Sequence, residues 1–158
     1  MRFSIPQPQW PIAILIVSLA TITQPTPAKE HWVGIYASNN SGISYKDWID
    51  RNQAYDYGVG WSFDEETMIH AKADYLTHNY RLIDVPEGKL PVYYGAGAAI
   101  ALGSDFVAGV RLPVGVNYLF QNAPYDVFIE VAPALLIFPS TEITVYGAIG
   151  VRYHFRLN

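Results

Sequence analysis

The chain has 158 residues, of which 51% are hydrophobic, 15% aromatic and 15% charged, so a single domain is expected. The charged share is well below the ~25% of ordinary soluble domains. Because the chain has no cysteine, neither a disulfide framework nor a thiolate metal site can form. The formal net charge of −4 and the lack of a basic cluster exclude nucleic acid as a partner.

Residues 1–28 are predicted to form a cleaved signal peptide. Arg2 supplies the positive start, the segment 11–22 is the apolar run, and Thr26 and Ala28 are the small residues that a signal peptidase reads. The run is shorter than the ~20 residues that a membrane-spanning helix needs. The alternative interpretation is a core helix or strand. We expect an exported protein.

The remaining segment, 29–158, is predicted to be one all-β domain. It divides into runs rich in β-branched and aromatic residues, separated by turn-forming residues. The expected strands are 31–38, 42–49, 54–63, 67–80, 91–103, 106–120, 124–138 and 143–156. No connection is long enough for a crossover helix, so neighbouring strands should pair antiparallel in chain order.

Side-chain alternation indicates the solvent around these strands. In 106–120, Val110, Leu112 and Val114 lie on one face, and Gly109 and Arg111 lie on the other. A face of glycine and alanine with isolated charges suits the narrow interior of an eight-stranded barrel. The large apolar face then meets lipid, and aromatic residues near the strand ends form an interfacial girdle. The prediction is an eight-stranded antiparallel up-and-down transmembrane β-barrel.

On this alternation Arg111 points into the lumen, opposite Gly97 if the intervening hairpin turns about Ser104. Two prolines complicate the pattern, because Pro113 and Pro133 each remove a ladder donor and a closed barrel has no edge strand to hold them. A β-bulge at either proline is expected, and it could exchange the inner and outer faces beyond it.

A polar cluster is expected in the lumen, and Lys72 belongs to the same inward set. The members of the candidate site are Lys46, Asp56, Asp74, His78, Arg111, Glu130 and Arg152. If the last hairpin turns about Thr141, Glu130 and Arg152 become cross-strand partners. One interpretation is a polar pore or small binding site. The preferred one is a structural plug of paired ions, because a lone buried ion costs several kcal/mol.

No metal site, cofactor site or catalytic residue is predicted. His31, His70, His78 and His154 lack metal-ligand spacing. A His–Ser–acid arrangement would make a lipid-modifying outer-membrane hydrolase. The nearest serines, Ser62, Ser104 and Ser140, lie at turns and none is two residues from a histidine, so this remains the least favoured alternative.

Several phrases together resemble a known group of proteins. They are GISYKDW (42–48), ADYLTHNY (73–80), LPVYYGAGA (90–98), GVRLPVGVNYLF (109–120), VFIEVAPAL (127–135) and GAIGVRYHF (147–155). The chain resembles small, largely uncharacterised bacterial outer-membrane β-barrel proteins of the OmpX/OmpA-barrel type over nearly all of 29–158. No activity is known for these motifs, so no functional residue is transferred. Such barrels often end on an aromatic residue that the assembly machinery recognises, whereas here Phe155 is followed by Arg-Leu-Asn.

We therefore expect a non-enzymatic outer-membrane protein with a structural role in the cell envelope. Its partners would be outer-membrane lipids and, during insertion, the barrel-assembly machinery; any small-molecule ligand is unknown. With a periplasmic N-terminus, the connections facing outward are short, and the longest, 82–91, lies on the periplasmic side. The rival class is a soluble periplasmic barrel of lipocalin type, with the aromatic face turned inward around an apolar ligand.

Overall fold

The structure is a computed structural model that describes residues 30–38, 41–62 and 67–156. The predicted signal peptide lies outside the described residues. Within them, no helix is long and apolar enough to cross a membrane. The described elements are the strands β1 (Glu30–Ser38), β2 (Gly42–Trp48), β3 (Gln53–Ser62), β4 (Met68–Asn79), β5 (Val92–Leu102), β6 (Phe106–Arg111), β7 (Val114–Leu119), β8 (Tyr125–Phe138) and β9 (Glu142–Arg156).

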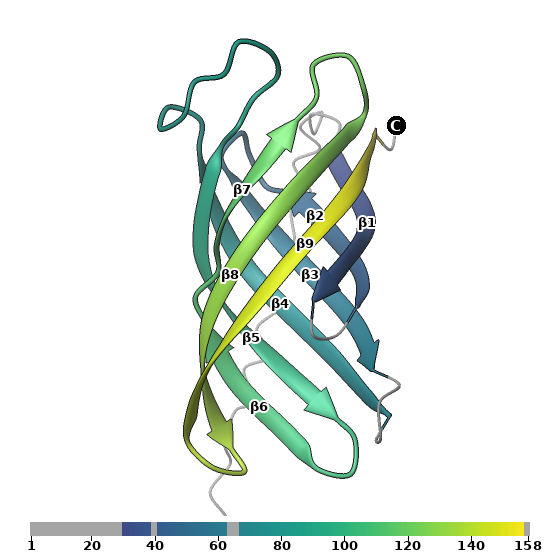
Figure 1. Cartoon of the computed structure of the whole chain (residues 1–158), viewed down its shortest axis with the longest axis vertical. Coiled ribbons are helices and arrows are strands. Elements are labelled where there is room, and N and C mark those ends of the chain that lie inside the picture. The colour runs from purple at the N-terminus through teal and green to yellow at the C-terminus, as the bar shows by residue number, and fades with distance from the viewer. Residues whose placement is uncertain (1–29, 39–40, 63–66, 157–158) are drawn as a thin grey trace, which may run out of the picture.

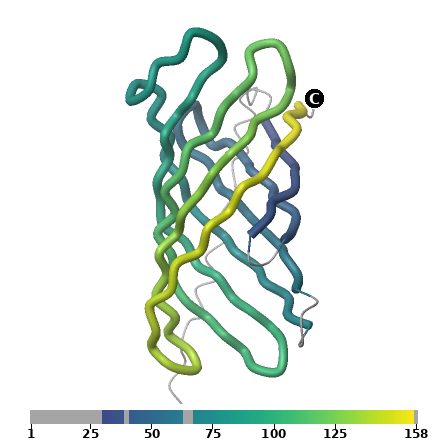
Figure 2. Tube along the Cα trace, viewed as in Figure 1, coloured from purple at the N-terminus to yellow at the C-terminus, as the bar shows by residue number. Residues whose placement is uncertain are grey.

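The strands close into a tall barrel in which every pairing is antiparallel (Figure 1). Strands that follow one another in the chain pair with each other, except β6 and β7, and β9 returns to pair with β1, so the first and last strands lie side by side (Figure 2). The described ends of the chain, Glu30 and Arg156, face each other at one end of the barrel, which we call the terminal end. The opposite end, which holds the connection 103–105 between β5 and β6, is called the far end.

The segments β6 and β7 together occupy one position in the barrel wall, since both pair with β5 and with β8. The wall therefore has eight positions, as predicted, although the described strand segments number nine. The interruption falls at Leu112 and Pro113. A proline has no backbone N–H, so it cannot complete the hydrogen-bonded ladder there.

The two prolines are accommodated by losing one donor each while keeping their carbonyls in the ladder. The amide of Gly95 donates to the Pro113 carbonyl at 2.9 Å, and the amide of Leu112 donates to the Pro133 carbonyl at 2.9 Å. The β-bulge expected at the prolines is wrong, since the register is constant across both, and the inner and outer faces are not exchanged. Arg111 and Pro113 are both buried, and so are Ala132 and Ala134. The register shift lies elsewhere, between Ala108 and Gly109 on the β6–β8 ladder.

The orientation of the wall is the predicted one. Outward-facing Val110, Val114 and Ile149 are 47%, 50% and 51% exposed, whereas Arg111 and Arg152 are buried. The rival soluble barrel requires the reverse arrangement. An outer surface covered by large apolar side chains is what hydrocarbon demands of a membrane barrel.

Aromatic rings gather near the ends of the strands, as predicted. At the terminal end the pairs Tyr118–Phe120, Tyr125–Tyr153, Tyr55–Tyr75, His31–Phe155 and His31–Tyr45 have ring centroids 4.9, 5.3, 5.7, 5.8 and 5.9 Å apart. Toward the far end Phe106 contacts Phe138 at 5.7 Å. Such rings belong at the two membrane–water interfaces, so they mark a band of wall suited to a bilayer. Phe63, at the end of the expected strand 54–63, lies outside the described residues.

Candidate functional site

The lumen contains three layers, and the middle one is ionic. Strand register brings its members to one level: Lys46 lies opposite Asp56, Asp56 opposite Asp74, and Asp74 opposite Gly97. Gly97 in turn lies opposite Arg111, which confirms the register predicted for that hairpin. Because strands alternate with a period of two, all these side chains share the inner face.

Glycines face the long basic side chains across the ladders. Arg111 lies opposite Gly97, Arg152 opposite Gly34 and Lys72 opposite Gly58. A Cβ added at Gly97 would lie 2.1 Å from Asp74 Oδ1, and one at Gly34 would lie 2.7 Å from Arg152 Cγ. The missing side chains therefore provide the space in which the ions meet.

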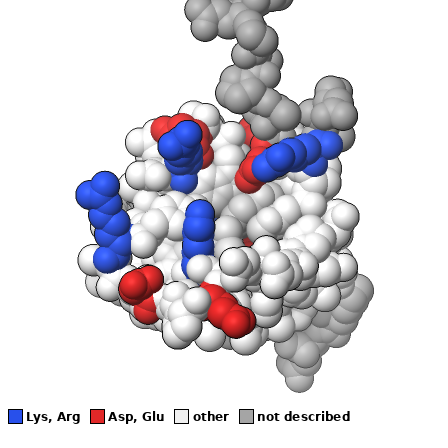
Figure 3. All heavy atoms as spheres, turned by 90° about the horizontal axis from the view of Figure 1, so that it is seen from above, with Lys and Arg blue, Asp and Glu red and all other residues white. Residues whose placement is uncertain are grey.

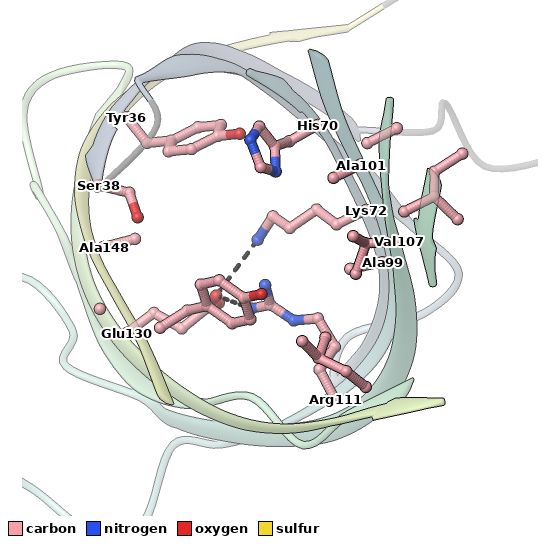
Figure 4. Close-up of a pocket in the computed structure, with 15 residues that line it drawn as sticks. Tyr36, Ser38, His70, Lys72, Ala99, Ala101, Val107, Arg111, Glu130 and Ala148 are labelled. Atoms are coloured by element: carbon pink, nitrogen blue, oxygen red, sulfur yellow. Dashed lines mark hydrogen bonds and ion pairs between the residues drawn. The ribbon is translucent and has the colours of Figure 1, made fainter. Parts of the chain in front are cut away.

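One part of the ionic layer is centred on Glu130. Its carboxylate receives Lys72 Nζ at 3.2 Å and a short contact from Arg111 Nη2 (Figure 4). It also accepts a hydrogen bond from the Tyr93 hydroxyl at 3.0 Å. Lys72 Nζ also lies 3.5 Å from Asp74, and Arg111 Nε lies 3.2 Å from the same carboxylate. Each basic group is thus shared between acids, which is how buried charges are compensated.

The other part is centred on Arg152, whose side chain is fully buried. Its Nε and Nη2 donate to the two oxygens of Asp126, both at 3.3 Å, and its Nη1 donates to Asp56 at 3.4 Å. The guanidinium also lies 4.0 Å from the centre of the Phe128 ring. Asp56 links the two parts, because Lys72 Nζ is 3.6 Å from its second oxygen.

The ionic layer is formally neutral. Its basic members are Lys46, Lys72, Arg111 and Arg152, and its acidic members are Asp56, Asp74, Asp126 and Glu130. Seven of these groups form one network of ion pairs, and Lys46 adds the fourth positive charge beside it. Opposite charges are therefore equal in number in the low-dielectric interior.

Lys46 joins this layer to an aromatic one at the terminal end. Its ammonium lies 4.9 Å from the centre of the Tyr93 ring and 5.7 Å from that of Trp48, and it lies 3.2 Å from His78 Nε2. An ammonium can only donate, so Nε2 is the acceptor. The ring proton then sits on Nδ1, which faces the Asn52 carbonyl at 3.2 Å.

Aromatic stacking fills the terminal half of the lumen. Trp32 stacks on His154 with centroids 3.8 Å apart and meets the edge of Trp48 at 4.9 Å. Tyr80 and Leu119 pack against these tryptophans. The terminal end is therefore closed by large side chains, and charges of both signs stand around its rim (Figure 3).

The far half of the lumen is instead lined mainly by small residues and contains a cavity of about 70 Å³ (Figure 4). Among its lining residues are Tyr36, Ser38, His70, Ala99, Ala101, Tyr146 and Ala148. Lys72, Arg111 and Glu130 of the ionic layer also line it. A volume of this size holds several waters, since one water needs about 10–15 Å³.

All seven residues of the predicted cluster are buried in the lumen, but one predicted contact is wrong. Glu130 lies opposite Ala148, and Arg152 lies opposite Asp126, so Glu130 and Arg152 are not cross-strand partners. The last hairpin turns about Pro139 instead of Thr141. A shift of the turn preserves which face each side chain occupies while changing its partner.

Sequence reasoning missed Asp126, a fully buried carboxylate that is the main partner of Arg152. It also missed Asn117, whose Nδ2 donates to Asp126 at 3.2 Å, and Ser44, which donates to Asp56 at 3.1 Å. The alternation of side chains along the strand could have identified Asp126, because it lies four residues before Glu130 and therefore on the same face.

The four histidines are spread over the barrel. His31 Nδ1 is hydrogen-bonded to the Tyr45 hydroxyl at 2.7 Å near the aromatic rings of the terminal end. His70 lines the far-end cavity. His154 lies 3.6 Å from Asp126. His78 contacts Lys46 and the Asn52 carbonyl. His78 and His154 pack on the same pair of tryptophans, whereas His31 and His70 lie elsewhere.

Comparison with known proteins identifies the fold. No family model matches the chain, and no curated protein matches it. The N-terminal β-barrel domain of Pseudomonas aeruginosa OprF matches with 14% identity and a TM-score of 0.61, covering 81% of this chain and 97% of that one. Neisserial surface protein A (NspA) matches with 14% identity and a TM-score of 0.52, covering 80% and 94% respectively. The chain has the fold of the small outer-membrane β-barrels of the OmpX/OmpA type, as its sequence motifs suggested.

Proposed function

We propose that this protein is an exported, non-enzymatic outer-membrane barrel with a structural role in the cell envelope and a lumen plugged by ion pairs. The observation that carries the proposal is the inversion of ordinary soluble architecture: the apolar side chains lie outside and the charged network lies inside. Large apolar patches in water mark interaction or aggregation surfaces, whereas a bilayer accepts them at no such cost.

The plug is supported by the way the ionic layer is built. Its carboxylates are at most 2% exposed. Lys72 and Arg111 each lie within 3.5 Å of both Asp74 and Glu130, and Arg152 lies within 3.5 Å of Asp126. A conducting pore needs a continuous column of water, but eight strands leave only enough interior for side chains to fill. The stacked rings of the terminal half would close the column a second time.

The proposed topology places the terminal end in the periplasm. Antiparallel barrels of this class keep both chain ends there, and the predicted signal peptide agrees with export. The longest described connection, 80–91, then lies on the periplasmic side. It is fastened to β7, because the Tyr118 hydroxyl donates to the Glu87 carbonyl at 3.0 Å and Lys89 pairs with Leu119. The connections on the outer side are short, which leaves little surface for a large partner.

Fractionation tests the membrane assignment. We expect the mature protein in detergent extracts of outer membranes, with a gel mobility that changes on heating because a folded barrel resists the detergent. Outer-membrane lipids and, during insertion, the barrel-assembly machinery would be its partners. Recovery as a detergent-free monomer from the periplasm would overturn the assignment and favour the soluble class.

Conductance tests the plug. In planar bilayers the wild-type barrel should pass no steady ionic current, and Glu130→Gln should give short openings, since it removes the acid shared by Lys72 and Arg111. A steady current through the wild type would contradict a sealed lumen while leaving the membrane assignment intact.

A further inference from the structure

The terminal end has a polar pocket on the outer side of its wall, with a volume of about 440 Å³. The residues that line it include Asn52, Thr77, Asn79, Tyr80, Arg81 and Tyr94. Thr77 and Tyr94 are cross-strand neighbours on β4 and β5, and the period of two puts them on the same outward face as the exposed Tyr75. None of the described residues that line the pocket is acidic, so its one permanent charge is the Arg81 guanidinium.

The hydrogen-bonding groups of this pocket are not used within the described part of the chain. There the side chains of Arg81, Thr77 and Tyr94 form no hydrogen bond or ion pair. Asn79 Oδ1 accepts from the Arg81 amide at 2.9 Å, which leaves Asn79 Nδ2 able to donate. The pocket therefore presents one cation and several neutral donors to a ligand that accepts hydrogen bonds.

Arg81 also differs from the lumenal arginines in having no acidic partner among the described residues. Arg111 and Arg152 are each held by two carboxylates. Asp50, in the turn that precedes β3, accepts from two backbone amides of its own turn at 2.7 and 2.8 Å, so its carboxylate is engaged there. The charge of Arg81 is thus left for an anion from outside the chain.

The aromatic rings place the pocket at the depth of lipid headgroups. Tyr55 and Tyr75, with ring centroids 5.7 Å apart, belong to the girdle of the terminal end, and Thr77 is two residues nearer that end of β4. Two residues of a strand span about 7 Å, which a tilt of about 45° reduces to about 5 Å along the bilayer normal. The headgroup region on each side of the hydrocarbon is about 5–8 Å thick, so the pocket lies level with lipid phosphates.

On the hydrocarbon side of the pocket, β4 and β5 carry small outward side chains. Ala96 lies opposite Tyr75, and Ala73 lies opposite Ala98, and all three alanines are exposed. Val110 on β6, opposite Ala98, is larger and 47% exposed. Short side chains let an acyl chain approach the wall closely, where it gains dispersion contacts. A ligand with a phosphate head and acyl chains therefore matches both surfaces.

We propose that the polar pocket binds the phosphodiester head of a phospholipid of the periplasmic leaflet whose headgroup carries no cation, as in phosphatidylglycerol. The Arg81 guanidinium donates to the phosphate oxygens, and the Thr77 hydroxyl and Asn79 amide donate to headgroup oxygens. A choline or ethanolamine head would bring its own cation beside Arg81, and no carboxylate lines the pocket to receive it. This inference rests on the proposed membrane location and topology, which place the terminal end among those lipids.

Amide chemical shifts test the proposal in dodecyl maltoside micelles, because this detergent contains no phosphate. The protein is titrated with dihexanoyl-phosphatidylglycerol, and we expect saturable shifts of the amides of Thr77, Arg81 and Tyr94. Dihexanoyl-phosphatidylcholine should need an about tenfold higher concentration for half-saturation, the loss of one charge-assisted interaction. Glycerol 3-phosphate has the phosphate without the acyl chains and should not saturate over the same range. Saturation at an equal concentration would identify a site for free phosphate and overturn the lipid assignment.

Three variants locate the head group. Arg81→Gln should raise the half-saturating concentration of dihexanoyl-phosphatidylglycerol about tenfold. Arg51→Gln is the matched control and should leave it unchanged, since Arg51 is exposed at the same end of the barrel but does not line the pocket. Thr77→Val keeps the shape of the side chain and removes its hydroxyl, so an about threefold rise is expected for one neutral hydrogen bond.

The proposal is overturned if the shifts spread over the whole girdle without saturating, are equal for the two lipids, and respond equally to Arg81→Gln and Arg51→Gln. Such behaviour is partition into the micelle together with diffuse surface charge. Loss of the heat-modifiable gel shift in the wild type is a different failure, because it overturns the membrane assignment itself. The gel shift is measured on every variant, so misfolding of Arg81→Gln leaves Thr77→Val and the comparison of the two lipids as the deciding tests.

Discussion

The buried guanidinium of Arg152 offers the sharpest test of the ionic layer. Arg152→Met keeps most of the side-chain volume against Phe128 but removes the charge, so Asp126 loses two hydrogen bonds at 3.3 Å and Asp56 loses one at 3.4 Å. Removing one partner of a buried ion pair costs about 3–5 kcal/mol, because the remaining charge stays buried without compensation.

The structure places this variant near the lower end of that range. Asp56 keeps the Ser44 hydroxyl at 3.1 Å and Lys72 at 3.6 Å, and Asp126 keeps the Asn117 amide at 3.2 Å. We expect the free energy of unfolding to fall by about 3 kcal/mol. Adding Asp126→Asn to Arg152→Met should restore part of this loss, since the amide removes one uncompensated charge.

Urea titration of the barrel refolded into lipid vesicles measures these differences through tryptophan fluorescence. Arg156→Met is the matched control on the same strand. Arg156 pairs with Glu30 at 2.6 Å, but its side chain is 69% exposed, and surface pairs contribute about 1 kcal/mol or less. Equal losses for Arg152→Met and Arg156→Met would refute the inference that the lumenal ions are desolvated.

Three further outcomes are expected. Gly97→Ala should lower the free energy of unfolding by about 1–3 kcal/mol through overpacking against Asp74, whereas Gly147→Ala, with open space around the new Cβ, should leave the urea midpoint within error; equal effects would mean that the lumen is loosely packed. Val110→Lys should cost about 2–4 kcal/mol in vesicles, the range for a lysine facing the bilayer midplane, and an unchanged midpoint would place that face in water. Leu112→Cys should react with a lipid-soluble maleimide and resist a charged one, and rapid labelling by the charged reagent would contradict the orientation.

Much of the fold could be predicted because a strand has a side-chain period of two. Once 106–120 was assigned as a strand, the faces of Val110 and Arg111 followed, and the structure has them outside and inside respectively. The inward position of Glu130 followed in the same way. The face on which a side chain lies does not depend on the exact position of the turn. Misplacing the last hairpin by two residues therefore did not change the predicted face of any residue.

Partner identity could not be predicted with the same certainty. Whether Arg152 meets Glu130 or Asp126 depends on where the chain turns between β8 and β9, and a turn about Pro139 selects Asp126. The prediction for Pro113 was wrong, because loss of a ladder donor is compatible with a break as well as with the bulge that was expected. The structure has a break, with each proline retaining its carbonyl bond.

The sequence by itself determined the class of barrel, the outward apolar face and most of the ions in the lumen, since these follow from local alternation and composition. Only the tertiary structure decided which ions pair, that a glycine faces Arg152, and that one half of the lumen is filled while the other holds a cavity. These features depend on the register between strands distant in the chain. Register is fixed when the barrel closes and all its turns are satisfied together, and no single segment contains that information.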